Sequence, residues 1–168
     1  MSRPRYDAER FLSDVESLFK SKLNDKLAAI NSEKLTMTSE TTDDFSVGTI
    51  SDSAWFMSHI PKVWNYPQFV VWGLTGTTIQ APQPGAALQA VSVSIEVVIP
   101  DKGEKNKESA IYKLLRYQRA LQEVAFENYD EFRHYGKIEL ESLPPGFVDI
   151  SGKMLRMSGI NITANMEV

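Results

Sequence analysis

Few side chains in this sequence have the type and spacing that catalysis or metal binding requires. The chain has two histidines, His59 and His134, and no cysteine. A zinc site would need both histidines together with carboxylates, and neither histidine stands at a ligand spacing from such residues. The sequence also contains no glycine-rich phosphate loop and no Gly-x-Ser-x-Gly motif. We therefore expect a protein that is not an enzyme and that uses no metal ion or cofactor.

Two pairs of carboxylates are the remaining candidates for acid or base chemistry. Asp43 and Asp44 are adjacent in a polar segment, whereas Glu139 and Glu141 alternate with apolar residues in a predicted strand that ends before Pro144. General acid or base catalysis needs a carboxylate in a desolvating pocket. A loop and the wet side of a strand do not provide one, so we interpret both pairs as solvated.

A third group of polar residues stands out by its regular spacing. From Val91 to Ile99 and from Ile160 to Val168, polar and apolar residues alternate, as expected of strands with one buried face. The other face meets solvent, a neighbouring subunit or a channel, and the alternation alone leaves these options open. The polar positions are Ser92, Ser94, Glu96, Asn161, Thr163, Asn165 and Glu167.

The elements that position these residues follow the order helix, strands, helix, strands. Apolar residues at three-and-four spacing predict amphipathic helices over 7–31 and 107–128. A polar loop is expected over 32–53, a loop rich in proline and glycine over 75–87, and a terminal strand over 155–168. This order predicts an α+β fold, in which a mixed or antiparallel sheet carries both helices on one side.

Length and composition set broader limits. A chain of 168 residues, 42% of them hydrophobic, is expected to form a single domain over 1–168. The apolar runs are shorter than a membrane helix requires, and residues 1–5 are not followed by the apolar segment of a signal peptide. The formal charge of -4 argues against a surface that binds duplex DNA. Protein partners are therefore expected, and a membrane is not.

In the order of its elements and in their residue patterns, the chain resembles the tail terminator and tail-completion proteins of long-tailed bacteriophages, which are small neck proteins. The resemblance covers nearly the whole chain. Relative to compact members of that family, the segments 32–53 and 75–87 are long. The features that carry the resemblance are the N-terminal amphipathic helix, the strand entry Tyr66–Trp72, the alternating strand Val91–Ile99, the helix Ile111–Val124 and a last strand that follows Leu155 and Arg156 and ends at Glu167 and Val168.

The resemblance implies a ring-forming α+β subunit that assembles as a homo-hexamer. It implies a structural virion protein of the tail or neck, made in the host cytoplasm, that caps the tail tube and joins the tail to the head connector. The tail tube protein and the connector or neck proteins would be its partners. DNA would pass through the lumen without specific binding, and the alternating polar residues named above would line that channel, with plain solvent exposure as the alternative.

Subunit contacts are expected in two places, and ordinary surface exposure is the alternative for both. The loop over 75–87 is stiffened by proline and has few groups to pack on its own subunit, so it is expected to reach a neighbour. Two arginines of the second helix are the other candidates, unless they lie on a solvated helix face. The expected contact residues are Gln80, Pro82, Pro84, Arg116 and Arg119.

Two alternative functions remain open from the sequence. One is another ring component of the phage neck or baseplate, such as a head-completion protein. The other belongs to a different class, a small intracellular ligand-binding or enzymatic α+β domain. Its pocket would be lined by Trp55, Phe56, Trp64 and Tyr66, although clustered aromatic residues of this kind are more often part of a core.

Overall fold

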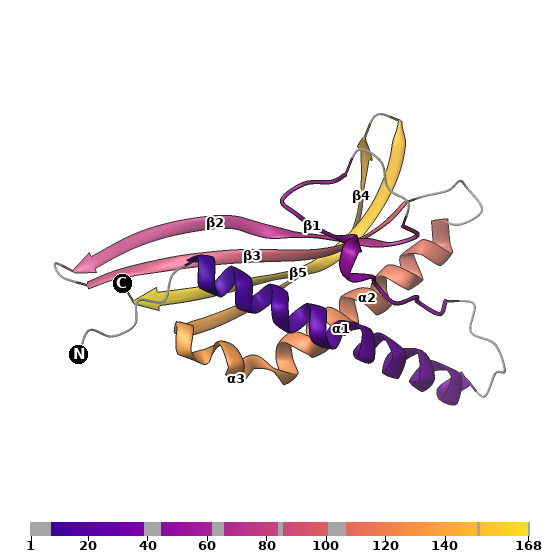
Figure 1. Cartoon of the computed structure of the whole chain (residues 1–168), viewed down its shortest axis with the longest axis horizontal. Helices are drawn as coiled ribbons and strands as arrows, with labels where there is room; N and C mark the ends of the chain where they lie inside the picture. The colour runs from indigo at the N-terminus through magenta and orange to yellow at the C-terminus, as the bar shows by residue number, and fades with distance from the viewer. Residues whose placement is uncertain are drawn as a thin grey trace.

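The computed structural model describes residues 8–38, 45–61, 66–83, 86–100, 107–150 and 152–167. They form an α+β fold with a mixed five-stranded sheet in the order β1-β2-β3-β5-β4 (Figure 1). The helical elements are α1 (Ala8–Thr38), the short 3-10 turn η1 (Asp52–Ala54), α2 (Lys107–Glu127), α3 (Tyr129–Phe132) and the 3-10 turn η3 (Arg133–Tyr135). The strands are β1 (Trp55–Met57), β2 (Phe69–Gln83), β3 (Ala86–Pro100), β4 (Lys137–Ile150) and β5 (Lys153–Glu167).

The two long helices, α1 and α2, lie on the same side of the sheet, which confirms the predicted fold class (Figure 1). Strand β1 pairs in parallel with β2, and every other pair of neighbouring strands is antiparallel. Each helix buries one apolar stripe, as its residue spacing predicts. The buried stripe of α1 consists of Phe11, Val15, Leu18, Phe19, Leu23, Leu27 and Ile30, and that of α2 includes Leu114, Tyr117, Leu121 and Val124. None of the described helices is long and apolar enough to cross a membrane.

The first helix is longer than the predicted span of 7–31, because it continues to Thr38. The expected polar loop over 32–53 is therefore wrong in its first part. The added turns contact α2, since Glu33 on α1 forms an ion pair with Arg119 on α2 through both carboxylate oxygens. Residues 39–44, which include the carboxylate pair Asp43 and Asp44, lie outside the described residues.

The rest of the expected loop is fixed on α1 by two asparagine side chains. The amide of Asn24 donates to the carbonyl of Ile50 at 2.9 Å, and its Oδ1 accepts from the N–H of Ile50 at 2.8 Å. Asn31 binds the backbone of Val47 in the same way, at 2.9 and 3.2 Å. The hydroxyl of Tyr117 on α2 donates to the carbonyl of Gly48 at 2.9 Å. These side chains replace the backbone partners that a strand would supply.

The expected loop over 75–87 is wrong for its described residues, because 75–83 belong to β2 and 86–87 to β3, and the two strands pair as a long hairpin. The register is continuous from Phe69 to Gln80 apart from one shift at Thr75, and a second shift falls between Gln80 and Gln83. Pro82 lies within that second shift, where a missing N–H removes no regular ladder bond. In Figure 1 this hairpin extends past the first turn of α1.

Strand β4 also continues beyond its predicted end. The motif Pro144-Pro145-Gly146 falls in a register shift between Leu143 and Gly146, and the strand resumes to Ile150. A bulge of this kind is tolerated because β4 is an edge strand and prolines there leave no central ladder bond unmade. The second helix and the terminal strand are confirmed at nearly their predicted bounds, as α2 and β5.

Candidate assembly surface

The alternating polar residues of β3 and β5 lie together on one side of the sheet. Ser92 is opposite Thr163, and Ser94 is opposite Asn161. Residues directly opposite in a ladder point to the same face, and the residues between them are buried on the helix side. We call this surface, which faces away from the helices, the polar face. It consists of Ser92, Ser94, Glu96, Asn161, Thr163 and Asn165.

Strand β4 adds charged residues to the polar face that were interpreted separately from the sequence. Glu139 lies opposite Thr163, Glu141 opposite Asn161 and Lys137 opposite Asn165. Lys137 donates to Glu139 at 2.8 Å. Together with Glu96 on β3, these residues give the face three glutamates and one lysine, so it is acidic. The alternation in β4 was visible in the sequence, but its position beside β5 was not.

Hydrogen bonds between neighbouring strands satisfy much of the polar face. The hydroxyls of Ser92 and Thr163 lie 2.8 Å apart, and the hydroxyl of Thr75 donates to Oδ1 of Asn161 at 3.1 Å. Ser94 is only 9% exposed, so it contributes little to a surface that another molecule meets. Glu167 lies in β5 opposite Leu88, and its side chain is outside the described residues.

Glu96 is a polar-face residue whose pKa is shifted by burial. It is partly buried, and burial raises the pKa of its carboxyl above the ordinary value of 4.5. The folded state therefore binds this proton more tightly than the unfolded state does. Ionisation of Glu96 consequently destabilises the fold as the pH rises above about 4.5.

Glu96→Gln should raise the melting temperature at neutral pH by a few degrees, because the amide carries no charge to desolvate. The gain should vanish near pH 4, where Glu96 is protonated in both states. Thermal melts followed by circular dichroism at both pH values check this. Glu141→Gln, at an exposed position of the same face, is the matched control and should change the melting temperature little at either pH. A lower melting temperature for Glu96→Gln at neutral pH would contradict the assignment.

The arginines expected at a subunit contact have partners within their own chain. Arg119 binds Glu33 through Nη1 at 3.1 Å and Nη2 at 2.6 Å, and its Nε donates to Glu123 at 2.6 Å. The hydrogen bond to Arg119 lowers the pKa of Glu33. Arg116 donates weakly to Asn31 at 3.4 Å. These bonds join α2 to α1, so a subunit contact at either arginine stays a prediction.

The other expected contact residues lie in the hairpin of β2 and β3. Gln80 is exposed in β2, opposite Leu88. The backbone of Pro82 belongs to β2, but its side chain is outside the described residues, as is the whole of Pro84. Contact with a neighbour therefore stays a prediction for this segment, although as a strand rather than as a loop.

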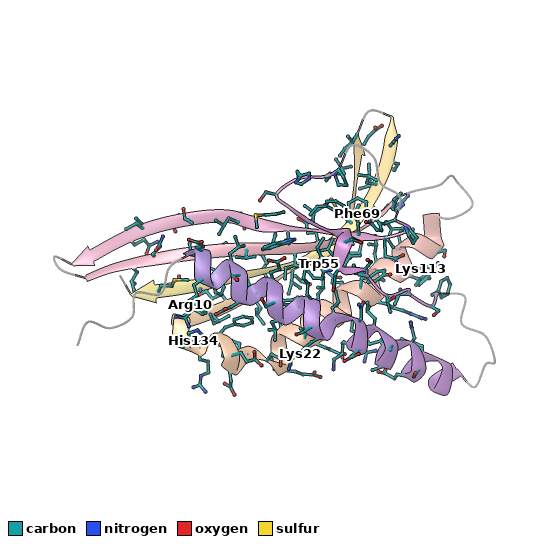
Figure 2. The ribbon with its side chains drawn as sticks, in the orientation of Figure 1. Arg10, Lys22, Trp55, Phe69, Lys113 and His134 are labelled. Carbon is teal, nitrogen blue, oxygen red and sulfur yellow. The ribbon has the colours of Figure 1, made fainter. Side chains whose placement is uncertain are left out.

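The aromatic residues of the alternative pocket do not share one face. Trp55 lies on the helix side, where the Lys20 ammonium sits 5.7 Å from its ring, and Figure 2 shows many side chains packed between α1 and the strands near it. Phe56 follows it in β1 and contacts Phe69 and Tyr66 at ring distances of 5.7 and 6.2 Å. Adjacent strand residues point to opposite faces. Trp64 lies outside the described residues.

The histidines lie apart in the structure as they do in the sequence. Nδ1 of His59 is 2.7 Å from the carbonyl of Met57, and the ring of His134 packs on Tyr135 at 4.1 Å. His134 and Lys22, both labelled in Figure 2, line a groove between α1 and the segment of α3 and η3. Within the described ranges, no three His, Asp or Glu side chains are grouped closely enough to hold a metal ion.

A groove of about 420 Å³ between α2 and β4 is a feature that the sequence did not indicate. Phe126 on α2 is 77% exposed beside it, and Leu140 on β4 is 39% exposed. Ala125 and Ile160 complete its apolar lining, and Glu123, Glu127 and Glu141 contribute to its walls. Phe126 falls outside the buried stripe of α2, and its apolar nature at that position was the available signal.

Neither the models of known protein families nor the curated proteins contain a match to this chain.

Proposed function

We propose that this chain is a structural subunit of a long-tailed bacteriophage, which caps the tail tube and joins the tail to the head connector as a hexameric ring. The protein is not an enzyme and needs no cofactor in this role. Its partners are further copies of itself, the tail tube protein and the connector or neck proteins. It acts in the tail or neck of the virion, after synthesis in the host cytoplasm.

The observation that carries the proposal is the two-sided sheet. One side is covered by α1 and α2, whereas the other exposes the polar face and the charged residues of β4. Copies arranged around an axis with their helices outward would surround a channel with hydroxyl, amide and carboxylate groups. Ser92, Asn161, Thr163 and Asn165 would contribute the neutral groups of that wall.

The charge of this face suits a channel through which DNA moves. Protein holds duplex DNA mainly by placing Lys and Arg side chains against its phosphates. The three glutamates beside the single lysine on this surface would offer few such contacts. A wall of this composition would let DNA pass without specific binding.

Capping a tube also requires no chemistry beyond binding. Identical rings stacked head to tail present the same interface at every level, so a tube grows until a subunit with a different outer face ends it. A ring with one face that fits the tube and another that does not would supply that end. Another neck or baseplate ring would use the same architecture but would not stop tube growth.

Tail tube assembly in the presence of this protein tests the proposal. The purified protein is expected to bind the ends of growing tubes and to stop their elongation, and its own mass should shift toward a hexamer at high concentration or at the tube end. Analytical ultracentrifugation and measurement of tube lengths check these outcomes. Bound rings that leave elongation unchanged would favour the other ring components, and a strict monomer that ignores tubes would exclude all of them.

A further inference from the structure

The two edges of the sheet are both open over part of their length. Strand β1 pairs with β2 only from Val70 to Trp72, and the amide of Ser58 adds one bond to Trp72. Beyond Gly73, no described strand pairs with the outer edge of β2. At the opposite edge, β4 has β5 on one side and no described strand on the other, and the hydroxyl of Tyr129 on α3 donates to the carbonyl of Ile138 at 3.3 Å. A monomeric protein usually protects such edges from pairing with another chain by placing charged residues on them.

The open part of β2 lacks that protection. From Phe69 to Ile95 the sequence contains no charged residue. Leu74 is 44% exposed and Ile79 is 73% exposed, both in the part of β2 that β1 does not reach. An uncharged, exposed edge with large apolar side chains is a template for pairing with another strand. The partner of such an edge must offer a surface with an apolar side chain at the same level and on the same side of the sheet.

The open edge of β4 provides that surface, at the same level of the sheet. Leu74 pairs with Val93, Val93 with Ile162 and Ile162 with Leu140. One row of side chains thus begins at an exposed leucine on β2 and ends at an exposed leucine on β4, both on the helix side. Beside Leu140 lies the groove with Phe126, whose floor is apolar.

The strand directions also fit. Three successive antiparallel pairings, from β2 through β3 and β5 to β4, leave β4 running opposite to β2. A second copy rotated about an axis along the strands would therefore place its β2 antiparallel to β4 of the first copy. Because the two edges are different surfaces at opposite ends of one sheet, the contact is heterologous, and a heterologous contact gives a ring when its rotation closes.

We propose that β2 of one copy, from Leu74 to Gln80, pairs antiparallel with β4 of the next copy, from Lys137 to Glu141, and that its apolar side chains cover Leu140 and Phe126. The partner is a second copy of this chain. The inference rests on the proposed ring and specifies how that ring closes. It makes the sheet continuous around the ring and leaves the polar face on one side of it.

Cysteine cross-linking tests this pairing. The chain contains no cysteine, so every disulfide must involve the introduced residues. Leu140→Cys is combined in turn with Leu74→Cys, Thr77→Cys or Ile79→Cys, which share the helix side of the sheet. Paired strands bring opposite Cβ atoms to about 4.5–5.5 Å, within reach of a disulfide after small adjustments. Mild oxidation of the assembled full-length protein should give a ladder of covalent multimers up to the hexamer for one of these pairs.

Matched variants define the face and the symmetry. Thr78→Cys with Leu140→Cys uses the same strand but the opposite face, so it should give no ladder. Each single variant should stay monomeric on a denaturing gel, whereas a mixture of Leu74→Cys and Leu140→Cys should stop at dimers. Every substituted position is exposed, and thermal melts of the reduced variants verify that each folds.

The outcomes separate this inference from the proposed function. A ladder from a helix-side pair supports it. Rings of hexamer mass that give no ladder with any of the three pairs would overturn the pairing and leave the ring intact. A dimer from Leu74→Cys alone would also overturn it, because that product requires two identical surfaces to meet. Absence of both rings and tube binding would instead overturn the proposed function.

Discussion

Removal of residues 164–168 should lower the melting temperature by about 10 °C or more, or abolish cooperative folding. Strand β5 lies between β3 and β4, so the deletion removes ladder bonds on both sides. It also removes Ala164 and Met166, which are fully buried on the helix side. Burial of one large apolar side chain contributes about 1.5–3 kcal/mol, and a domain is stable by only about 5–15 kcal/mol. Thermal melting of the truncated chain checks this.

The double substitution Thr163→Lys and Asn165→Lys is the matched control for that deletion. Both residues lie on the polar face of the same strand, where they are only partly buried. The lysines should change the melting temperature little, although Thr163 loses its hydrogen bond to Ser92. They should impair assembly or DNA passage, because they place cations on the proposed channel wall. A truncated chain that melts like the full chain would contradict the account of β5.

Gly159→Ala should destabilise the fold by about 1–3 kcal/mol or more, which corresponds to a loss of roughly 3–10 °C in melting temperature. A Cβ at this position would lie 2.1 Å from the carbonyl oxygen of Ile95 and 2.8 Å from Cα of Glu96. Both atoms belong to the backbone of β3, so β3 and β5 would have to separate where they are paired. Chemical denaturation of the variant measures the effect.

Gly76→Ala is the matched control, because an added Cβ at Gly76 meets nothing within 4 Å. The expected change in the free energy of unfolding is within about 0.5 kcal/mol. Equal destabilisation by the two substitutions would indicate a general effect of replacing glycine in a strand. It would argue against a close approach specific to Gly159.

The main elements could be predicted because each has its own periodicity. The apolar stripe of α2 and the alternation in β5 depend on residues within one segment, so both were assigned at nearly the observed bounds. The choice of face for Ser92 and Thr163 followed from the same alternation. What local pattern could not supply was that β3 and β5 are neighbours, which places these two residues opposite each other.

The errors arose where a distant partner decides the local structure. Residues after Asn31 resemble a loop because they are polar, yet α1 continues to Thr38, and Glu33 in its added turns pairs with Arg119 of α2. Proline and glycine signals were read as breaks at 75–87 and at Pro144. In both places the strand passes through a register shift, and both lie on sheet edges where a missing N–H is tolerated.

The row of side chains from Leu74 to Leu140 could not be predicted from the sequence, for the same reason. Each leucine by itself looks like an ordinary apolar residue of a strand. Only the order β1-β2-β3-β5-β4 and the three registers show that the two lie at one level and on one face. The exposed ring of Phe126 beside Leu140 depends on how α2 packs over β4.

Electron cryomicroscopy of this protein bound to the ends of tail tubes tests the central claim most directly. We expect a six-fold ring at one end of each tube, with α1 and α2 on the outside and the polar face of β3 and β5 toward the channel. Helices that line the channel, a ring of another symmetry that leaves tube length unchanged, or a protein that stays monomeric and leaves tube ends bare would contradict it.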